Sequence, residues 1–195
     1  NFRLLFYRGQ APFYDPLVEQ EVFSRLDPKK KTVLYAPTWN DADRSSSYFT
    51  WTPTLLQELP SDWNLIFKLH PLLEERNPAE FYSLLARVEE KKGVVLLDAF
   101  PPIYPLLARI DAYLGDASSI GYDFLAFNRP LFFFPTPHPL PLHECGTLIT
   151  HPRDLFFEEE VLSARREALY QKTFAPLRSL AEVRESILTL EGAKR

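Results

Sequence analysis

Short apolar runs alternate with helical patterns along most of this chain, and that alternation restricts the fold more than any other feature of the sequence. The runs are rich in Val, Ile, Leu, Tyr and Phe, which is typical of strands buried on both faces. They are Thr32–Ala36, Leu65–Leu69, Val94–Leu97, Ala112–Leu114 and Pro130–Phe134. Strands that alternate with helices form a parallel sheet with right-handed crossovers. We therefore expect an α/β fold, a Rossmann-like parallel sheet flanked by helices.

The predicted helices lie between these runs and beyond the last one. They are Thr52–Glu58, Pro78–Glu90, Pro102–Arg109 and Ser119–Phe127, followed by the C-terminal patterns Phe156–Lys172 and Leu177–Leu190. The C-terminal helices are expected to pack across the domain or against a neighbour. With 195 residues, of which 46% are hydrophobic, the chain can form one domain, residues 1–195, with its own core. Two polar or proline-rich segments, Asp41–Ser47 and Thr136–Pro141, are predicted to be exposed loops.

Charge and composition exclude several classes of protein. A net charge of −4 provides no basic face for nucleic acid. No apolar run approaches the roughly 20 residues that span a bilayer. The absence of G-x-G-x-x-G and Walker sequences argues against an ordinary dinucleotide or ATP site. Cys145 is the only cysteine, which favours a reducing, cytoplasmic setting. Because the chain has no methionine, even at position 1, we expect an excised domain or a processed fragment.

Polar residues follow three of the predicted strands directly. Thr38, Trp39 and Asn40 come after the first strand, His70 comes after the second, and Gly115–Ser119 comes after the fourth. In an open parallel sheet, ligands bind outside the carboxyl ends of the strands. The three clusters are therefore expected to lie on one rim.

The chemistry of these residues suits a diphosphate. His70 can bind a phosphate oxygen or carry a proton near neutral pH, although it could instead bond a backbone carbonyl. Ser118 and Ser119 can offer hydroxyl and backbone donors to an anion, or cap a helix, or do both. Asp116 could hold a ribose or polyol hydroxyl, or favour the start of the helix. Trp39 could wall the site or belong to the core.

Two other groups of reactive side chains give weaker signals. His138, His143, Glu144, Cys145 and His151 could ligate a metal, but their spacings match no zinc pattern, so neither a metal nor a cofactor is expected. A serine nucleophile would need the G-x-S-x-G elbow, which is absent around Ser118. Asp123, one turn into the helix, is expected to be structural.

Three motifs resemble the CDP-glycerol glycerophosphotransferase family of teichoic-acid-type polymerases and primases. They are V-L-Y-A-P-T-W-N at 33–40, F-K-L-H-P at 67–71, and G-D-A-S-S-I-G-Y-D-F at 115–124 followed by N-R-P-L-F-F-F. The segment G-Q-A-P-F-Y-D-P-L at 9–17 is similar to a degenerate form of the family's G-x-P-R-x-D sequence. The resemblance covers the chain from Gly9 to about Phe134.

The resemblance implies the C-terminal, nucleotide-binding half of a two-domain GT-B fold. By it, His70 would contact the donor phosphate, Ser118 and Ser119 would cradle the pyrophosphate, and Asp116 would match the aspartate before them. The implied reaction is attack by an acceptor hydroxyl on the distal phosphorus of CDP-glycerol, with release of CMP. The general base and the lipid-linked or polyol acceptor are expected on an N-terminal domain absent from this chain. Membrane contact at the inner face would also come from that domain, and the isolated chain would be inactive.

Two positions depart from the family pattern. Asn40 stands where the family has Arg, and Ala117 stands where it has Tyr; Arg44 is close enough in sequence to replace the lost guanidinium. Two other functions therefore remain open. One is a sugar-nucleotide glycosyltransferase or epimerase-like domain, and the other is a non-catalytic interaction or assembly module on the same fold.

Overall fold

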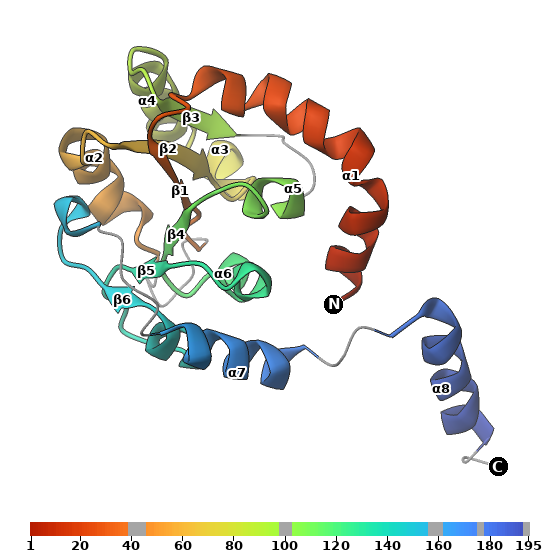
Figure 1. The fold of residues 1–195 in the computed structure, drawn as a ribbon. Helices are drawn as coiled ribbons and strands as arrows, with labels where there is room; N and C mark the ends of the chain where they lie inside the picture. The colour runs from red at the N-terminus through yellow and green to blue at the C-terminus, as the bar shows by residue number, and fades with distance from the viewer. Residues whose placement is uncertain (39–45, 98–102, 156–161, 175–177, 193–195) are drawn as a thin grey trace.

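The structure, a computed structural model, describes residues 1–38, 46–97, 103–155, 162–174 and 178–192. Within these residues a six-stranded parallel sheet has the order β3-β2-β1-β4-β5-β6 (Figure 1). The strands are β1 (Lys31–Tyr35), β2 (Trp63–Lys68), β3 (Val94–Leu97), β4 (Ala112–Gly115), β5 (Leu131–Phe133) and β6 (Thr147–Leu148). The predicted strands and their parallel arrangement are confirmed. Sequence reasoning missed β6, whose two residues are too few to form a pattern.

The strand order reverses at the centre of the sheet. β1 lies between β2 and β4, with Tyr35 opposite both Phe67 and Leu114. The chain first adds strands on one side of β1 and then crosses to the other side with β4. In sheets of this order, the crevice at the carboxyl ends of the two central strands is where ligands bind.

Helices cover both faces of the sheet (Figure 1). They are α1 (Phe2–Glu21), α2 (Tyr48–Glu58), α3 (Leu72–Arg76), α4 (Pro78–Glu89), α5 (Ile103–Leu107), α6 (Ser119–Phe124), α7 (Ser163–Thr173) and α8 (Leu180–Gly192), with 3₁₀ turns at Phe23–Arg25, Leu125–Phe127, Pro141–Cys145 and Pro152–Asp154. None of the helices in these described parts is long and apolar enough to cross a membrane.

Alternating side chains of each strand form two apolar cores. Val33 and Tyr35 of β1 pack with α2 and α4, whereas Leu34 packs with α1, α5 and α6 on the opposite face. Successive side chains of a strand point to opposite faces, so one five-residue strand supports both cores. The sheet is thus the rigid centre on which the residues at its edge depend.

The first helix, α1, was not predicted. Pro12 and Pro16 lie inside it, and each proline removes a backbone donor from the helix. Packing offsets this cost, because Val18 and Val22 at its C-terminal end are fully buried in the second core. The family-like segment at 9–17 is therefore helical.

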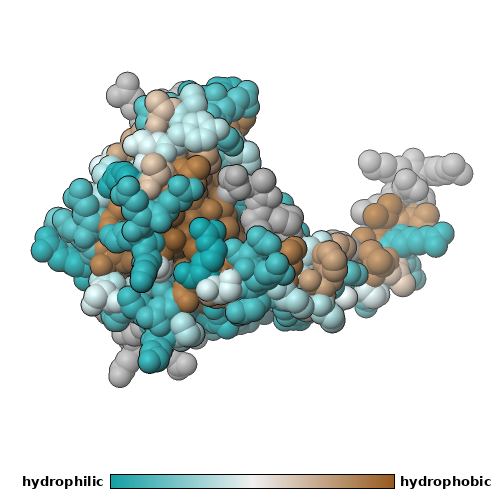
Figure 2. Space-filling model, turned by 90° about the horizontal axis from the view of Figure 1, so that it is seen from above, coloured by the Kyte–Doolittle hydropathy of each residue, from teal (hydrophilic) through white to brown (hydrophobic). Residues whose placement is uncertain are grey.

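The two C-terminal helices differ in how they pack. The start of the predicted helix 156–172 lies largely outside the described residues, but α7 packs on the second core through Leu169 and Tyr170. The last predicted helix corresponds to α8, which leaves Leu180, Ile187 and Leu188 exposed. Figure 2 shows apolar surface gathered on this projecting arm.

Gly115 provides a test of how closely the sheet edge is packed. A Cβ at this position would lie 2.7 Å from Cζ of Tyr113, so Gly115→Ala must displace a buried ring. We expect the free energy of unfolding to fall by roughly 1–3 kcal/mol. Urea denaturation followed by circular dichroism measures it. The control is Gly9→Ala, since nothing lies within 4 Å of that position and a helical alanine stabilises by up to about 1 kcal/mol. Equal unfolding midpoints for the two variants would contradict the packing argument.

Candidate functional site

The predicted site residues that the structure describes do meet at the carboxyl edge of the sheet. The backbone N–H of Thr38, after β1, donates a hydrogen bond to Asp116, after β4. Thr38 and His70 both line a small depression of about 10 Å³, together with Ser46 and Phe49. Trp39, Asn40 and Arg44 lie outside the described residues.

Asp116 is the most completely satisfied polar residue of this edge. Its side chain is 0% exposed. One carboxylate oxygen accepts the Thr38 N–H at 2.7 Å, and the other accepts both the backbone N–H and the hydroxyl of Ser47 at 2.7 Å. In this arrangement Asp116 bonds to the protein's own groups, so it holds Thr38 and the start of α2 against β4.

Ser47 corrects one expectation from the sequence. The sequence predicts an exposed loop over Asp41–Ser47, but Ser47 is 4% exposed because both its N–H and its hydroxyl bind Asp116. Its single hydroxyl proton goes to Asp116, so the 2.8 Å contact between Ser47 Oγ and Tyr35 Oη is donated by the tyrosine. A serine directly before a helix is a familiar signal for a side chain that caps the helix. The side chain of Ser47 instead donates its hydrogen bond to the carboxylate of Asp116.

Burial governs the electrostatics of this edge. Removal from water raises the pKa of the Asp116 carboxyl, while the hydrogen bonds from Ser47 and Thr38 act in the opposite direction. Burial, together with the nearby Asp116, also raises the pKa of Tyr35 and of Tyr113. Both phenols therefore remain protonated donors, and the Tyr113 hydroxyl donates to the carbonyl of Ala36 at 3.1 Å.

Ser118 and Ser119 occupy different positions at the start of α6. Ser118 is 7% exposed, and its hydroxyl oxygen accepts the N–H of Ile120 at 3.4 Å, so the capping role considered from the sequence is confirmed. Ser119 is exposed at the first position of the helix. Of the two hydroxyls, the Ser119 hydroxyl is therefore the one at the surface.

His70 is exposed and comes directly after β2 and Leu69. Its Nδ1 accepts the backbone N–H of Leu72 at 3.2 Å. An accepting Nδ1 carries no proton, so the proton of the neutral imidazole is on Nε2. The ring thus has the tautomer that can present an N–H donor to an anion. The Pro71 turn and α3 fix this geometry just beyond β2.

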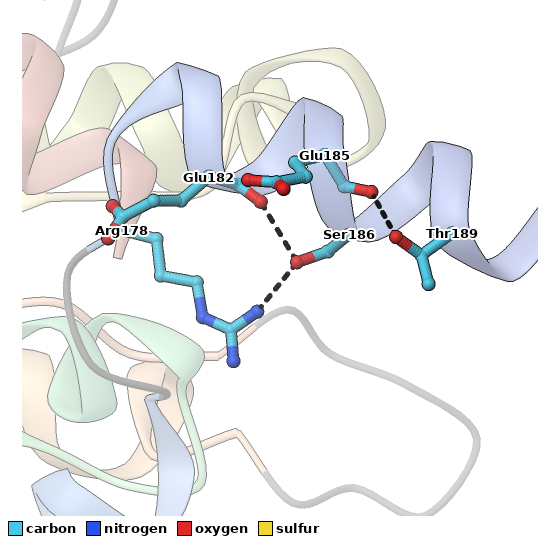
Figure 3. A pocket seen from close by; sticks show the side chains of 5 residues that line it. All are labelled: Arg178, Glu182, Glu185, Ser186 and Thr189. Atoms are coloured by element: carbon cyan, nitrogen blue, oxygen red, sulfur yellow. Dashed lines mark hydrogen bonds between the residues drawn. The ribbon is translucent and has the colours of Figure 1, made fainter.

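Another hollow shares Tyr48 and Phe49 with this depression. A larger one runs along α8, and its lining residues Arg178, Glu182 and Ser186 all come from that helix or the residues before it (Figure 3). It contains no residue of the sheet edge. Among the described residues no group of three or more His, Cys, Asp or Glu side chains could hold a metal ion.

Comparison with known sequences identifies related proteins. A family model described as CDP-glycerol:poly(glycerophosphate) glycerophosphotransferase matches residues 10–137. The teichoic acid glycerol-phosphate primase of Bacillus subtilis strain 168 is 28% identical over 107 residues, which cover 54% of this chain and 26% of that protein. The teichoic acid glycerol-phosphate transferase of Staphylococcus aureus is 30% identical over 112 residues, with 54% and 26% covered. The chain thus spans about a quarter of these relatives' length.

Comparison with solved structures confirms the fold. A variant of the wall teichoic acid polymerase TagF has a TM-score of 0.57 and 19% identity, covering 98% of this chain and 50% of that chain. A form of TagF soaked with CDPG has a TM-score of 0.57 and 20% identity, with 87% and 42% covered. UDP-GlcNAc 2-epimerase from Neisseria meningitidis bound to UDP-GlcNAc has a TM-score of 0.54 and 13% identity, with 89% and 44% covered. The chain has the expected GT-B half-domain architecture.

The hydrogen bonds of Asp116 can be tested by a shape-conserving substitution. In Asp116→Asn the side-chain NH₂ must face either Thr38 N–H or the two Ser47 donors, so buried donors oppose each other. We expect the free energy of unfolding to fall by roughly 1–3 kcal/mol in urea denaturation. The exposed Asp62→Asn is the matched control and should change it by less than about 0.5 kcal/mol. An Asp116→Asn variant as stable as this control would refute the assigned role.

Proposed function

Because the chain belongs to the CDP-glycerol:poly(glycerophosphate) glycerophosphotransferase family, we propose that it is the donor-binding domain of a transferase acting on CDP-glycerol. The resemblance carried by its motifs is thereby confirmed. In the proposed reaction, glycerol phosphate or a related polyol phosphate passes to an acceptor hydroxyl and CMP is released. The observation that carries the proposal is the meeting of the matched segments, Thr38, His70 and the Asp116 turn, at the switch point of the sheet.

The described residues suggest distinct roles in donor binding. The Nε2–H of His70 would donate to a phosphate oxygen, because its Nδ1 is already occupied by Leu72. Ser119 would offer an exposed hydroxyl to the diphosphate, and Ser118 would act mainly through the helix start that it caps. Asp116 would position Thr38 and Ser47. Thr38, Trp39, Asn40 and Arg44 complete the proposed donor site. A site of this kind accelerates transfer by position and charge stabilisation.

The acceptor side of the reaction is proposed to lie outside these 195 residues. The chain covers 26% of the related primase and 42–50% of the TagF chains, which leaves room for a second domain in a longer protein. We place the general base, the lipid-linked or polyol acceptor and any peripheral contact with the inner face of the membrane on that domain. The isolated chain is then expected to bind donor in the cytoplasm without turnover.

Calorimetric titration of the chain with CDP-glycerol, CMP, a UDP-sugar and UMP tests the proposal. We expect saturable binding of the cytidine ligands. His70→Ala should weaken CDP-glycerol binding about tenfold or more, because a hydrogen bond to a charged phosphate is lost. Ser119→Ala should weaken it less, and pairing it with Ser118→Ala should add the loss of the helix cap. The exposed His138→Ala, in the loop after β5, is the control and should bind like the wild type.

Two outcomes would replace the proposal. Preference for uridine ligands would favour a sugar-nucleotide glycosyltransferase or epimerase-like function, which the likeness to the Neisseria enzyme leaves compatible with the fold. Absence of nucleotide binding by this chain and by the longer protein would leave a non-catalytic assembly module.

A further inference from the structure

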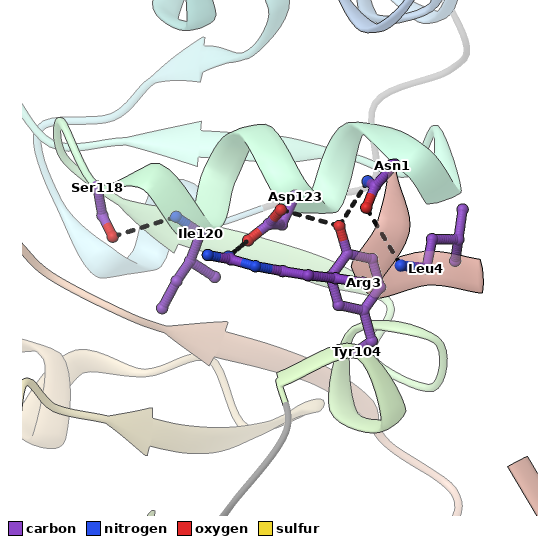
Figure 4. A network of polar contacts seen from close by, with 7 residues as sticks. All are labelled: Asn1, Arg3, Leu4, Tyr104, Ser118, Ile120 and Asp123. Carbon is purple, nitrogen blue, oxygen red and sulfur yellow. Dashed lines mark hydrogen bonds and ion pairs between the residues drawn. The ribbon is translucent and has the colours of Figure 1, made fainter. Parts of the chain in front are cut away.

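A second buried carboxylate lies on α6, a few residues beyond the turn from Gly115 to Ser119. Asp123, on α6, is 6% exposed. One of its oxygens accepts the hydroxyl of Tyr104 at 2.8 Å, and the other accepts the guanidinium of Arg3 at 3.1 Å. Figure 4 shows these partners converging on Asp123 from α5 and from the first turn of α1. We call Asn1, Arg3, Tyr104 and Asp123 the α6 clasp.

The clasp is closed by the residue that caps α1. Asn1 donates its amide N–H to the Tyr104 oxygen at 2.6 Å, and its own side-chain oxygen accepts the N–H of Leu4 at 3.1 Å. Burial and the neighbouring Asp123 raise the pKa of Tyr104, so its hydroxyl stays protonated and donates to the carboxylate. The orientation of every hydrogen bond is therefore defined.

The carboxylate of Asp123 is satisfied only when two distant elements are in place. A buried carboxylate is costly unless it is paired and hydrogen-bonded. Its partners Arg3 and Tyr104 are 120 and 19 residues away in the sequence. Moving α6 relative to α5 would leave one carboxylate oxygen without its hydrogen bond, and moving it relative to α1 would separate the carboxylate from Arg3.

The helix that the clasp holds is short and begins at the proposed donor turn. α6 has six residues, and Asp123 is one turn from Ser119. The Ser118 cap and the Asp123 clasp act along the same helix (Figure 4). A displacement at Asp123 is therefore carried directly to Ser118 and Ser119.

The attachment of α1 does not itself require the clasp. Val18 and Val22 are fully buried, and Glu19 forms an ion pair with Arg109, just beyond α5. The guanidinium of Arg109 also lies over the Phe23 ring, 4.1 Å from its centroid. These contacts hold the C-terminal end of α1 without involving Asp123, so the specific effect of the clasp is to fix α6.

We propose that Asp123 is a positioning residue of the donor site, which sets the place of Ser118 and Ser119 by holding α6 to Arg3 and Tyr104. This inference rests on the proposed function. It assigns α1 a part in donor affinity, although no residue of the α6 clasp belongs to the donor-binding set proposed above.

The test compares variants that open the clasp with one that loosens α1 elsewhere. Asp123→Asn removes the charge that pairs with Arg3, and Tyr104→Phe removes the hydroxyl that bonds both Asp123 and Asn1. Glu19→Gln weakens the ion pair with Arg109. We expect each clasp variant to weaken CDP-glycerol binding about fivefold, the equivalent of one net hydrogen bond. We also expect faster hydrogen exchange at the amides of 120–124. The Glu19→Gln variant should match the wild type in both measurements.

Calorimetry separates positioning from simple loss of folded protein. A partly unfolded variant lowers the binding stoichiometry, whereas a misplaced α6 raises the dissociation constant at unchanged stoichiometry. Clasp variants that bind CDP-glycerol as tightly as the wild type would overturn the inference and leave the proposed function intact. Clasp variants that bind CDP-glycerol no more weakly than the Glu19→Gln variant would also overturn the inference. Absence of binding of CDP-glycerol and CMP by the wild-type chain and by the longer protein would overturn both.

Discussion

The carboxylate of Asp116 is the interaction on which the organisation of this edge depends. It sits at the switch point of the sheet and joins residues 78 and 69 positions away, through Thr38 and Ser47. Burying a carboxylate is unfavourable in itself, and three short hydrogen bonds offset that cost only if both partners are in place. The positions of Thr38 and Ser47 are therefore fixed by the fold and not by the sequence next to them.

Two buried tyrosines extend this polar edge into the cores. Tyr35 packs in the core beside α2, and Tyr113 packs in the core on the other face. Each ring is apolar along its body and polar at its tip. Their hydroxyls reach Ser47 and the Ala36 carbonyl, so the rings that fill the two cores also satisfy groups at the carboxyl ends of the strands. The packing of these two rings and the geometry of the sheet edge therefore depend on each other.

The sheet could be predicted from the sequence because each strand is indicated by the residues of its own short segment. The strands are runs of apolar residues, and the order of strands and helices fixes their direction. The helix α1 escaped prediction because Pro12 and Pro16 argue against it and only tertiary packing decides. The burial of Ser47 depends on a carboxylate 69 residues away, which no local pattern reports. The common rim of Thr38 and His70 was predictable, since parallel register brings strand ends together.

The turn from Gly115 to Ser119 is anchored at both ends by buried carboxylates. Asp116 is held by the segments before α2, and Asp123, one helical turn beyond Ser119, is held by α1 and α5. These partners come from opposite faces of the sheet, so neither face can shift without straining the turn. A loop fixed in this way loses little conformational freedom when a ligand binds. The stability of the fold and the proposed affinity for a diphosphate are therefore linked through the same two side chains.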